Sequence, residues 1–153
     1  MPFDTEAKRI IDTVLAASRA EQTEVTVQAV DSSLTRFANN EVHQNVAQRD
    51  TSIWVRACVG RRFGVATIND PSGAALAACA EKALEIAQAM PDQGEDYIPL
   101  PAPQHIPRID GYNVATAEFG PMQRAAGARV ICARASEAGF NAAGAFRVDV
   151  AGL

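Results

Sequence analysis

The side chains in this sequence that are best suited to chemistry gather around one predicted hairpin. The six polar residues at this hairpin are Arg36, Asn39, Asn40, His43, Gln44 and Asn45. Amides and imidazoles are unusual in strands unless they bond something. Because an amide both donates and accepts hydrogen bonds, such a surface can hold the backbone of an extended peptide. A solvent-facing sheet surface explains the same residues equally well.

No motif of a metal site or of nucleophilic catalysis is present. A His-Glu-x-x-His zinc site needs two histidines one helical turn apart, whereas His43 and His105 lie in different segments and neither precedes a glutamate. The cysteines, Cys58, Cys79 and Cys132, lack Cys-x-x-Cys spacing and suit reduced, buried packing. A Cys58–His43 pair on neighbouring strands, or a reactive Cys132, is a separate hydrolase alternative. We expect no catalytic residue, no metal ligand and no cofactor in this chain.

Composition places the chain among globular proteins of ordinary polarity. Hydrophobic residues make up 48% and charged residues 21% of 153 residues, enough for one domain with a core. A net charge of -4 gives no electrostatic reason to bind nucleic acid or an anionic membrane. We read no signal peptide and no membrane-spanning run, and therefore expect a cytoplasmic protein.

Alternation with a period of two predicts successive strands in the first half of the chain. The expected strands are residues 25–29, 34–38, 42–47, 53–59 and 63–67, with a last one within 140–150. Turn chemistry is expected at Asp31–Ser33, Asn39–Asn40 and Gly60–Arg61, and a polar connection at Gln48–Asp50. Short connections favour antiparallel pairing.

Three helices are expected around these strands. The first is capped by Asp4 or Thr5 and ends before Thr23. The second has Asp70 at its cap and Pro71 at its first position, and it stops before Pro91. The third spans 121–138 and ends at Gly139.

The predicted fold class is α+β, an antiparallel sheet of about five or six strands with helices packed on one face. The proline-rich segment 91–112 is expected to be a loop that wraps across the sheet or the helices. Residues 1–153 are expected to form a single domain.

The hairpin and several later blocks resemble the N-terminal domain of the TldD/PmbA family, also called modulators of DNA gyrase. These blocks follow in family order over nearly the whole chain. They are 35–40, 42–46, 55–56, 60–70, 83–87, 91–92, 100–101, 110–112, 116–117, 124–125, 138–140 and 143–146. The residues of the hairpin block resemble those of PmbA-like members of the family.

The resemblance implies an α+β domain that precedes a larger β-rich domain in dimers enclosing a peptide-cleaving chamber. Catalytic relatives carry a His-Glu-x-x-x-His helix and a later cysteine for zinc in their C-terminal region. This sequence stops shortly after Phe146, so none of those ligands can be carried over. Whether the chain is an enzyme is left open by the resemblance, and it is expected to be inactive alone.

The leading hypothesis is a non-catalytic N-terminal domain of a TldD/PmbA-like zinc metallopeptidase. It would contribute to the substrate chamber, to unfolded-peptide binding and to contacts with a like subunit in a homo- or hetero-dimer. No direct contact with nucleic acid or membrane is expected. The alternative is a stand-alone dimerisation or interaction module with no peptidase role.

Overall fold

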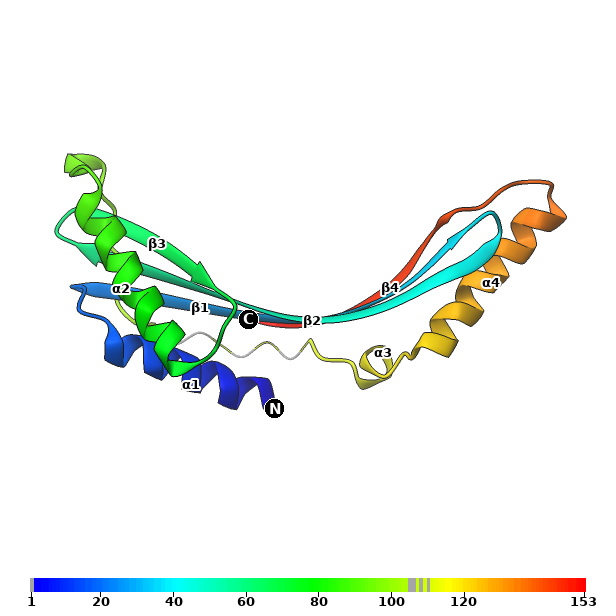
Figure 1. Cartoon of the computed structure of the whole chain (residues 1–153), viewed down its shortest axis with the longest axis horizontal. Helices are drawn as coiled ribbons and strands as arrows, with labels where there is room; N and C mark the ends of the chain where they lie inside the picture. The colour runs from blue at the N-terminus through cyan, green and yellow to red at the C-terminus, as the bar shows by residue number, and fades with distance from the viewer. Residues whose placement is uncertain (1, 105–106, 108, 110) are drawn as a thin grey trace. The chain divides into compact units, whose positions relative to one another are not determined.

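The computed structural model describes residues 2–104, 107, 109 and 111–153. Helices and strands alternate in blocks along the chain, as Figure 1 shows. The elements are α1 (Pro2–Ala17), β1 (Gln22–Ala38), β2 (Glu41–Val59), β3 (Arg62–Ile68), α2 (Gly73–Ala89), the 3-10 turn η1 (Gly94–Asp96), α3 (Val114–Ala117), α4 (Pro121–Glu137) and β4 (Gly144–Gly152).

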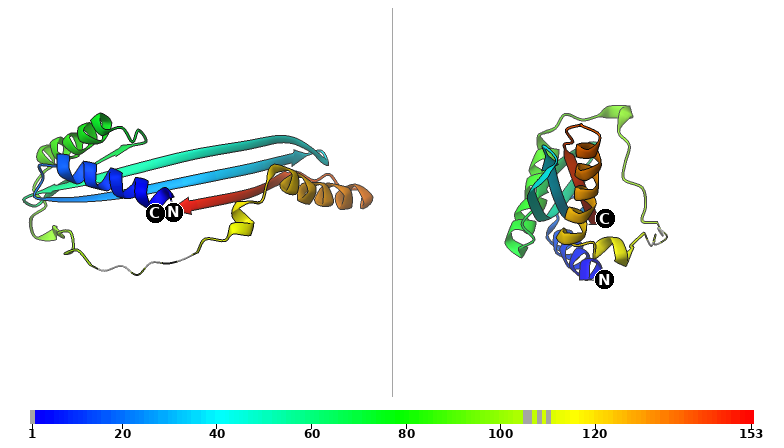
Figure 2. Two further views of the ribbon diagram at one scale, coloured as in Figure 1. Left: turned by 90° about the horizontal axis from the view of Figure 1, so that it is seen from below. Right: turned by 90° about the vertical axis from the view of Figure 1, so that its right-hand side faces the viewer.

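The strands form one antiparallel sheet in the order β3-β2-β1-β4. β2, β1 and β4 lie side by side in Figure 2. The α+β class and the antiparallel pairing are confirmed. The predicted strand count was too high, because the described residues form four strands rather than five or six.

The difference arises at two polar stretches, for which the sequence predicts a turn and a connection. Asp31–Ser33 and Gln48–Asp50 both lie inside continuous strands. Arg49 donates to both carboxylate oxygens of Asp31, at 2.5 and 2.8 Å. This hydrogen-bonded pair lowers the pKa of Asp31. The polar residues therefore pair with each other across β1 and β2 instead of turning the chain.

Two compact units share the long strands β1 and β2. The first unit comprises residues 1–29, 51–107 and 152–153, and the second comprises 30–50 and 108–151. Each unit has its own buried cluster.

In the first unit α1 and α2 cover one face of the sheet. Ile53, Val55 and Ala57 alternate along β2 and are fully buried under these helices. Their helical partners in the core are Ile10, Val14, Leu76, Cys79, Ala80 and Ala83. Small residues on α2 allow close approach, and Gly64 of β3 lies against the backbone of that helix.

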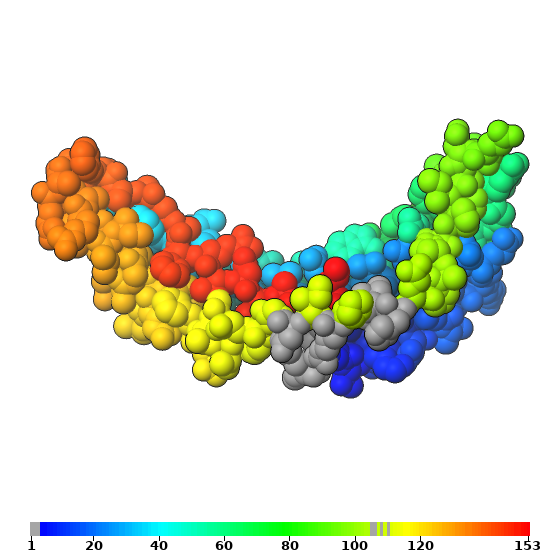
Figure 3. Space-filling view, turned by 180° about the vertical axis from the view of Figure 1, so that it is seen from behind, coloured from blue at the N-terminus to red at the C-terminus, as the bar shows by residue number. Residues whose placement is uncertain are grey.

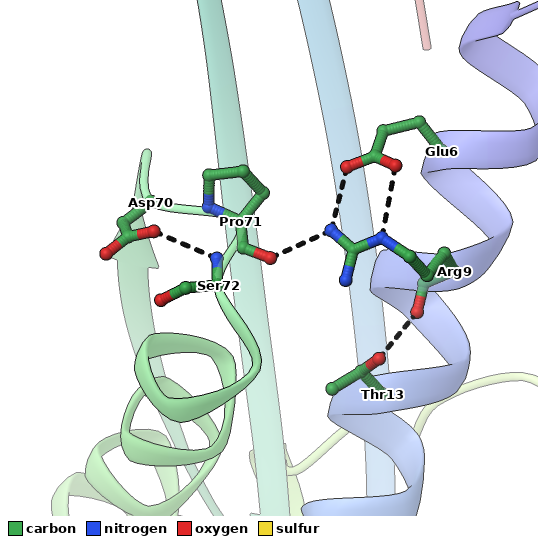
Figure 4. A network of polar contacts seen from close by, with 6 residues as sticks. All are labelled: Glu6, Arg9, Thr13, Asp70, Pro71 and Ser72. Carbon is green, nitrogen blue, oxygen red and sulfur yellow. Dashed lines mark hydrogen bonds and ion pairs between the residues drawn. The ribbon is translucent and has the colours of Figure 1, made fainter.

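A polar network joins α1 to the start of α2 (Figure 4). Arg9 is held by the Glu6 carboxylate and donates to the carbonyl of Pro71 at 2.8 Å. Asp70 accepts from the backbone N–H of Ser72 at 2.9 Å. The cap of α2 is therefore Ser72 and its first residue Gly73. The predicted cap at Asp70 and first position at Pro71 were wrong by two residues, because Asp70 closes the preceding turn.

The other helix boundaries also refine the predictions. α1 begins at Pro2, so Asp4 and Thr5 lie in its first turns rather than at a cap. α4 spans Pro121–Glu137 and is followed by Gly139 at φ +73°, in agreement with the predicted end. The positive φ explains why a glycine stands there.

In the second unit α4 packs on β1, and it lies beside β4 on the surface seen in Figure 3. Phe37 of β1 is buried against Ala128 and Cys132 of α4. Gly127 on the helix leaves room for the ring of Phe146, which stacks on Phe119 with ring centroids 5.5 Å apart.

The tip of the β1–β2 hairpin is tied to the segment after α4. Asn39 and Asn40 form the turn at φ 51° and 61°, as their tolerance of the left-handed region predicts. The side chain of Asn40 donates to the Phe140 carbonyl at 2.9 Å and accepts from the Ala142 N–H at 2.7 Å. Asn39 accepts a more exposed bond from Asn141.

The first part of the proline-rich segment is anchored to the first unit. Gln93 donates to the Arg61 carbonyl, and Leu100 donates to the Gln22 side chain. A hydrogen bond with Cys58 raises the pKa of Tyr97. Apart from η1, the described residues of 91–112 form no helix or strand.

Among the described residues, no helix is both long and apolar enough to cross a membrane.

Gly64→Ala should destabilise the protein by about 1–3 kcal/mol through overpacking. A Cβ at this position would lie 2.3 Å from the Ala87 nitrogen and 2.4 Å from the Ala83 oxygen, both backbone atoms. Gly73→Ala is the control, since its Cβ meets nothing within 4 Å and alanine favours a helix. Urea unfolding followed by circular dichroism compares the two midpoints, and equal midpoints would contradict the close packing.

Asn40→Gly should lower the stability by about 1–2 kcal/mol, because the variant keeps the positive φ but loses two hydrogen bonds. Asn39→Gly is the matched control: it has the same backbone requirement and loses only the bond from Asn141. Thermal unfolding followed by far-UV circular dichroism measures the stability of both variants. A larger loss for the Asn39 variant would refute the role assigned to Asn40.

Candidate functional site

The sheet face opposite α4 carries a hollow of about 520 Å³ in the second unit. It lies within the size range of ligand sites. The side chains that line it come from three strands. They are Val30, Ser32, Leu34 and Arg36 of β1, Gln44, Val46, Gln48 and Asp50 of β2, and Arg147 of β4.

Strand alternation explains which residues face the hollow. Along β1, Thr35 and Phe37 are buried on the side of α4. Leu34 and Arg36 must then point to the opposite, uncovered face. The floor is apolar where Leu34 and Val46 lie, and polar groups surround it.

The charges of this site are unevenly paired. Arg147 donates to Asp149 at 2.8 Å, and this bond, with a further one from Ser32, lowers the pKa of Asp149. In the part of the chain that the structure describes, the polar partner of the Arg36 side chain is the neutral Gln44 side chain, at 3.3 Å. Among the described residues Asp50 has no ion pair. The hollow therefore contains one cation and one anion without an ionic partner.

The structure divides the six predicted residues between several roles. Arg36 and Gln44 come together in the hollow. Asn45 lies on the other side of the sheet, where it accepts from Thr35 at 2.5 Å. The buried Arg124 of α4 in turn donates to Thr35 and to the Phe119 carbonyl, so the amide of Asn45 belongs to an internal network.

His43 marks a break in the alternation of β2. Val42 packs on the α4 side with Phe37, Gln44 faces the hollow, and Asn45 again lies on the α4 side. Two residues of one regular strand lie on the same face only if their sequence numbers differ by an even number. Val42 and Asn45 differ by three, so the strand between them must contain an extra residue. We infer a β-bulge between Val42 and Gln44, which leaves His43 exposed.

Asn39 and Asn40 lie at the hairpin tip and bond the chain after α4, as described above. The sequence prediction missed Leu34, Val46 and Asp50, although alternation with period two places Leu34 on the same face as Arg36 in β1, and Val46 and Asp50 on the same face as Gln44 in β2. The bulge hid this, since it shifts the register of β2 relative to the turn.

The described residues offer no cluster of zinc-binding side chains. No group of three or more His, Cys, Asp or Glu side chains converges in the described part of the chain. The three cysteines are free and buried, and burial raises the pKa of the Cys79 thiol. Cys58 and His43 lie on the same strand, β2, and not on neighbouring strands as expected. His105 lies outside the described residues.

A smaller hollow of about 200 Å³ lies on the uncovered sheet face of the first unit. Trp54 lines it together with Val65 and the ion pair of Arg56 with Glu24. The Nε of Arg56 is buried without a hydrogen-bond partner.

Comparisons with known proteins agree on one family. Residues 23–87 match the family model for the PmbA/TldA metallopeptidase domain 1. A search of curated protein sequences finds no match.

Solved structures share the fold at low sequence identity. TldE from Thermococcus kodakarensis superposes with a TM-score of 0.75 at 15% identity, over 95% of this chain and 34% of that chain. A proposed modulator of a DNA gyrase from Thermotoga maritima gives 0.63 at 12%, over 94% and 38%. Another from Bacteroides thetaiotaomicron gives 0.68 at 10%, over 94% and 38%.

This chain thus spans between a third and two fifths of the length of those structures. Its matched segment includes β2, β3 and most of β1 and α2. The resemblance seen in the hairpin is confirmed for this segment: residues 23–87 match a domain of the PmbA/TldA family, and the solved structures share the fold.

Proposed function

We propose that this chain is a non-catalytic N-terminal domain of a TldD/PmbA-like zinc metallopeptidase, and that it binds unfolded peptide and contributes to the substrate chamber. The hollow on the uncovered sheet face of the second unit is the observation that supports this function. In the proposal, zinc and bond cleavage belong to the C-terminal region of a catalytic relative, and this chain supplies a surface.

The lining of the hollow suits an extended peptide. Apolar side chains from Val30, Leu34 and Val46 offer contact area for alternate side chains of the peptide. Gln44 and Gln48 offer amides that both donate and accept hydrogen bonds to its backbone. A peptide without fixed structure can adopt the strand conformation that this sheet face requires.

The position of β4 adds a second route of contact. β4 lies at the end of the strand order, and an edge strand presents backbone N–H and C=O groups for pairing. Arg147 of β4 also lines the hollow. A peptide strand added beside β4 would therefore lie next to the same site.

The alternative function, a stand-alone dimerisation module, is favoured by a different observation. Apolar side chains on and just after α4 are exposed, namely Met122, Val130, Ile131 and Phe140. Such side chains are common at subunit contacts. In the leading proposal the same residues contact a TldD/PmbA-like subunit.

We place both functions in the cytoplasm, where free cysteines stay reduced.

Leu34→Asp should weaken peptide binding by about tenfold or more, since it puts a charge on the apolar floor of the hollow. Val130→Asp is the matched control, an exposed apolar residue of α4 outside the hollow. Fluorescence anisotropy with an unstructured polypeptide of about 20 residues, end-blocked, measures both affinities.

Sedimentation velocity on the same samples separates the two functions. A protein that binds no polypeptide but forms a dimer, which the Val130 variant disrupts, would replace the peptide-binding proposal with the dimerisation module. Equal loss of peptide affinity in both variants would also contradict the hollow as the site.

A further inference from the structure

The two ends of the hollow on the second unit, taken along the strands, carry opposite charges. Thr35 bonds Asn45 and Asp31 bonds Arg49, so β1 and β2 keep one register through this region. In that register Arg36 lies opposite Gln44, as their hydrogen bond requires, and Val30 lies opposite Asp50. Arg36 and Asp50 therefore occupy the two ends of the hollow.

At each end of the hollow lies a charged side chain without an ionic partner among the described residues. Arg147, the other cation in the lining, is neutralised by Asp149 at 2.8 Å. Arg36 is bonded only to a neutral amide, and Asp50 has no ion pair among the described residues. Between them lie the apolar Leu34 and Val46.

The spacing of these charges corresponds to a short peptide. Arg36 and Val30 are six residue steps apart along β1, which at about 3.3 Å per step is about 20 Å. An extended peptide of about six residues has its terminal carboxylate and ammonium groups separated by about the same length. A longer chain passing through the hollow would place neutral backbone beside both charges.

We propose that the hollow binds peptides of about six residues with both ends free, the C-terminal carboxylate against Arg36 and the N-terminal ammonium against Asp50. This inference rests on the proposed peptide-binding function and adds a preferred length, a direction and a preference for free ends. The guanidinium of Arg36 can make a forked, charge-assisted contact with the carboxylate. Asp50 accepts hydrogen bonds from the ammonium group.

The test uses one neutral hexapeptide in four forms: both ends free, C-terminally amidated, N-terminally acetylated, and blocked at both ends. Isothermal titration calorimetry measures each form against the wild type, Arg36→Gln and Asp50→Asn. Arg129→Gln is the control, because it removes the same charge from an exposed position of α4 outside the hollow. Thermal melts verify that each variant is folded.

Amidation should weaken binding to the wild type and to Arg129→Gln by about three- to fivefold, the size expected of one exposed ion pair. In Arg36→Gln that difference should disappear, while the effect of acetylation stays. Asp50→Asn should show the reverse pattern. Both differences should shrink as salt is raised.

Three results would overturn the inference in distinguishable ways. If all four forms bind the wild type equally, free ends are not recognised, although peptide binding itself and the proposed function survive. If none binds, and the end-blocked 20-residue polypeptide does not bind either, both proposals fail. A dimer that Arg36→Gln or Asp50→Asn dissociates would assign the two charges to a second copy of this chain instead.

Discussion

The register between β1 and β2 is the constraint on which the rest of the structure depends. Both compact units are built on these two strands. A slip by one residue would transfer every side chain of a strand to the other face. Ile53 and Val55 would then leave the core under α1 and α2, and Leu34 would leave the hollow. Cross-strand pairs such as Asp31 with Arg49 are consistent with a single pairing.

That register is not the one that the hairpin turn alone would impose. Asn39 and Asn40 form a two-residue turn, which pairs Ala38 with Glu41. Beyond the bulge between Val42 and Gln44 the pairing shifts by one residue. The shift lets Phe37 and Val42 share the α4 side and still puts Arg36 and Gln44 together on the other face. A bulge next to a candidate site is a recurrent way to re-aim side chains.

Much of the fold was predictable because local signals and tertiary structure agree. The turn at Asn39–Asn40, the end of α4 at Gly139 and the strand alternation in β2 around Val55 all follow from backbone preferences or burial. Prediction was wrong where a residue type has two uses. Asp31 can close a turn or accept from an arginine across a strand, and only the partner strand decides between them. Asp70 similarly bonds Ser72 before the helix instead of capping it.

The candidate site was less predictable for a related reason. Polar residues in strands suggested ligand binding, yet the side-chain amides of Asn40 and Asn45 accept hydrogen bonds within the protein, from Ala142 and Thr35. Those partners are distant in sequence or buried, so composition does not reveal them.

The hydrogen bonds from the hairpin tip to Ala142 also affect the order in which parts of the chain can fold during synthesis. The residues of the first unit are nearly all synthesised by Pro107, and domains commonly fold as they emerge. The hairpin residues 30–50, by contrast, remain without α4 until residues 121–137 leave the ribosome, with Phe37 uncovered in the meantime. A nascent chain halted before residue 121 therefore exposes the apolar Phe37 that α4 covers in the folded structure.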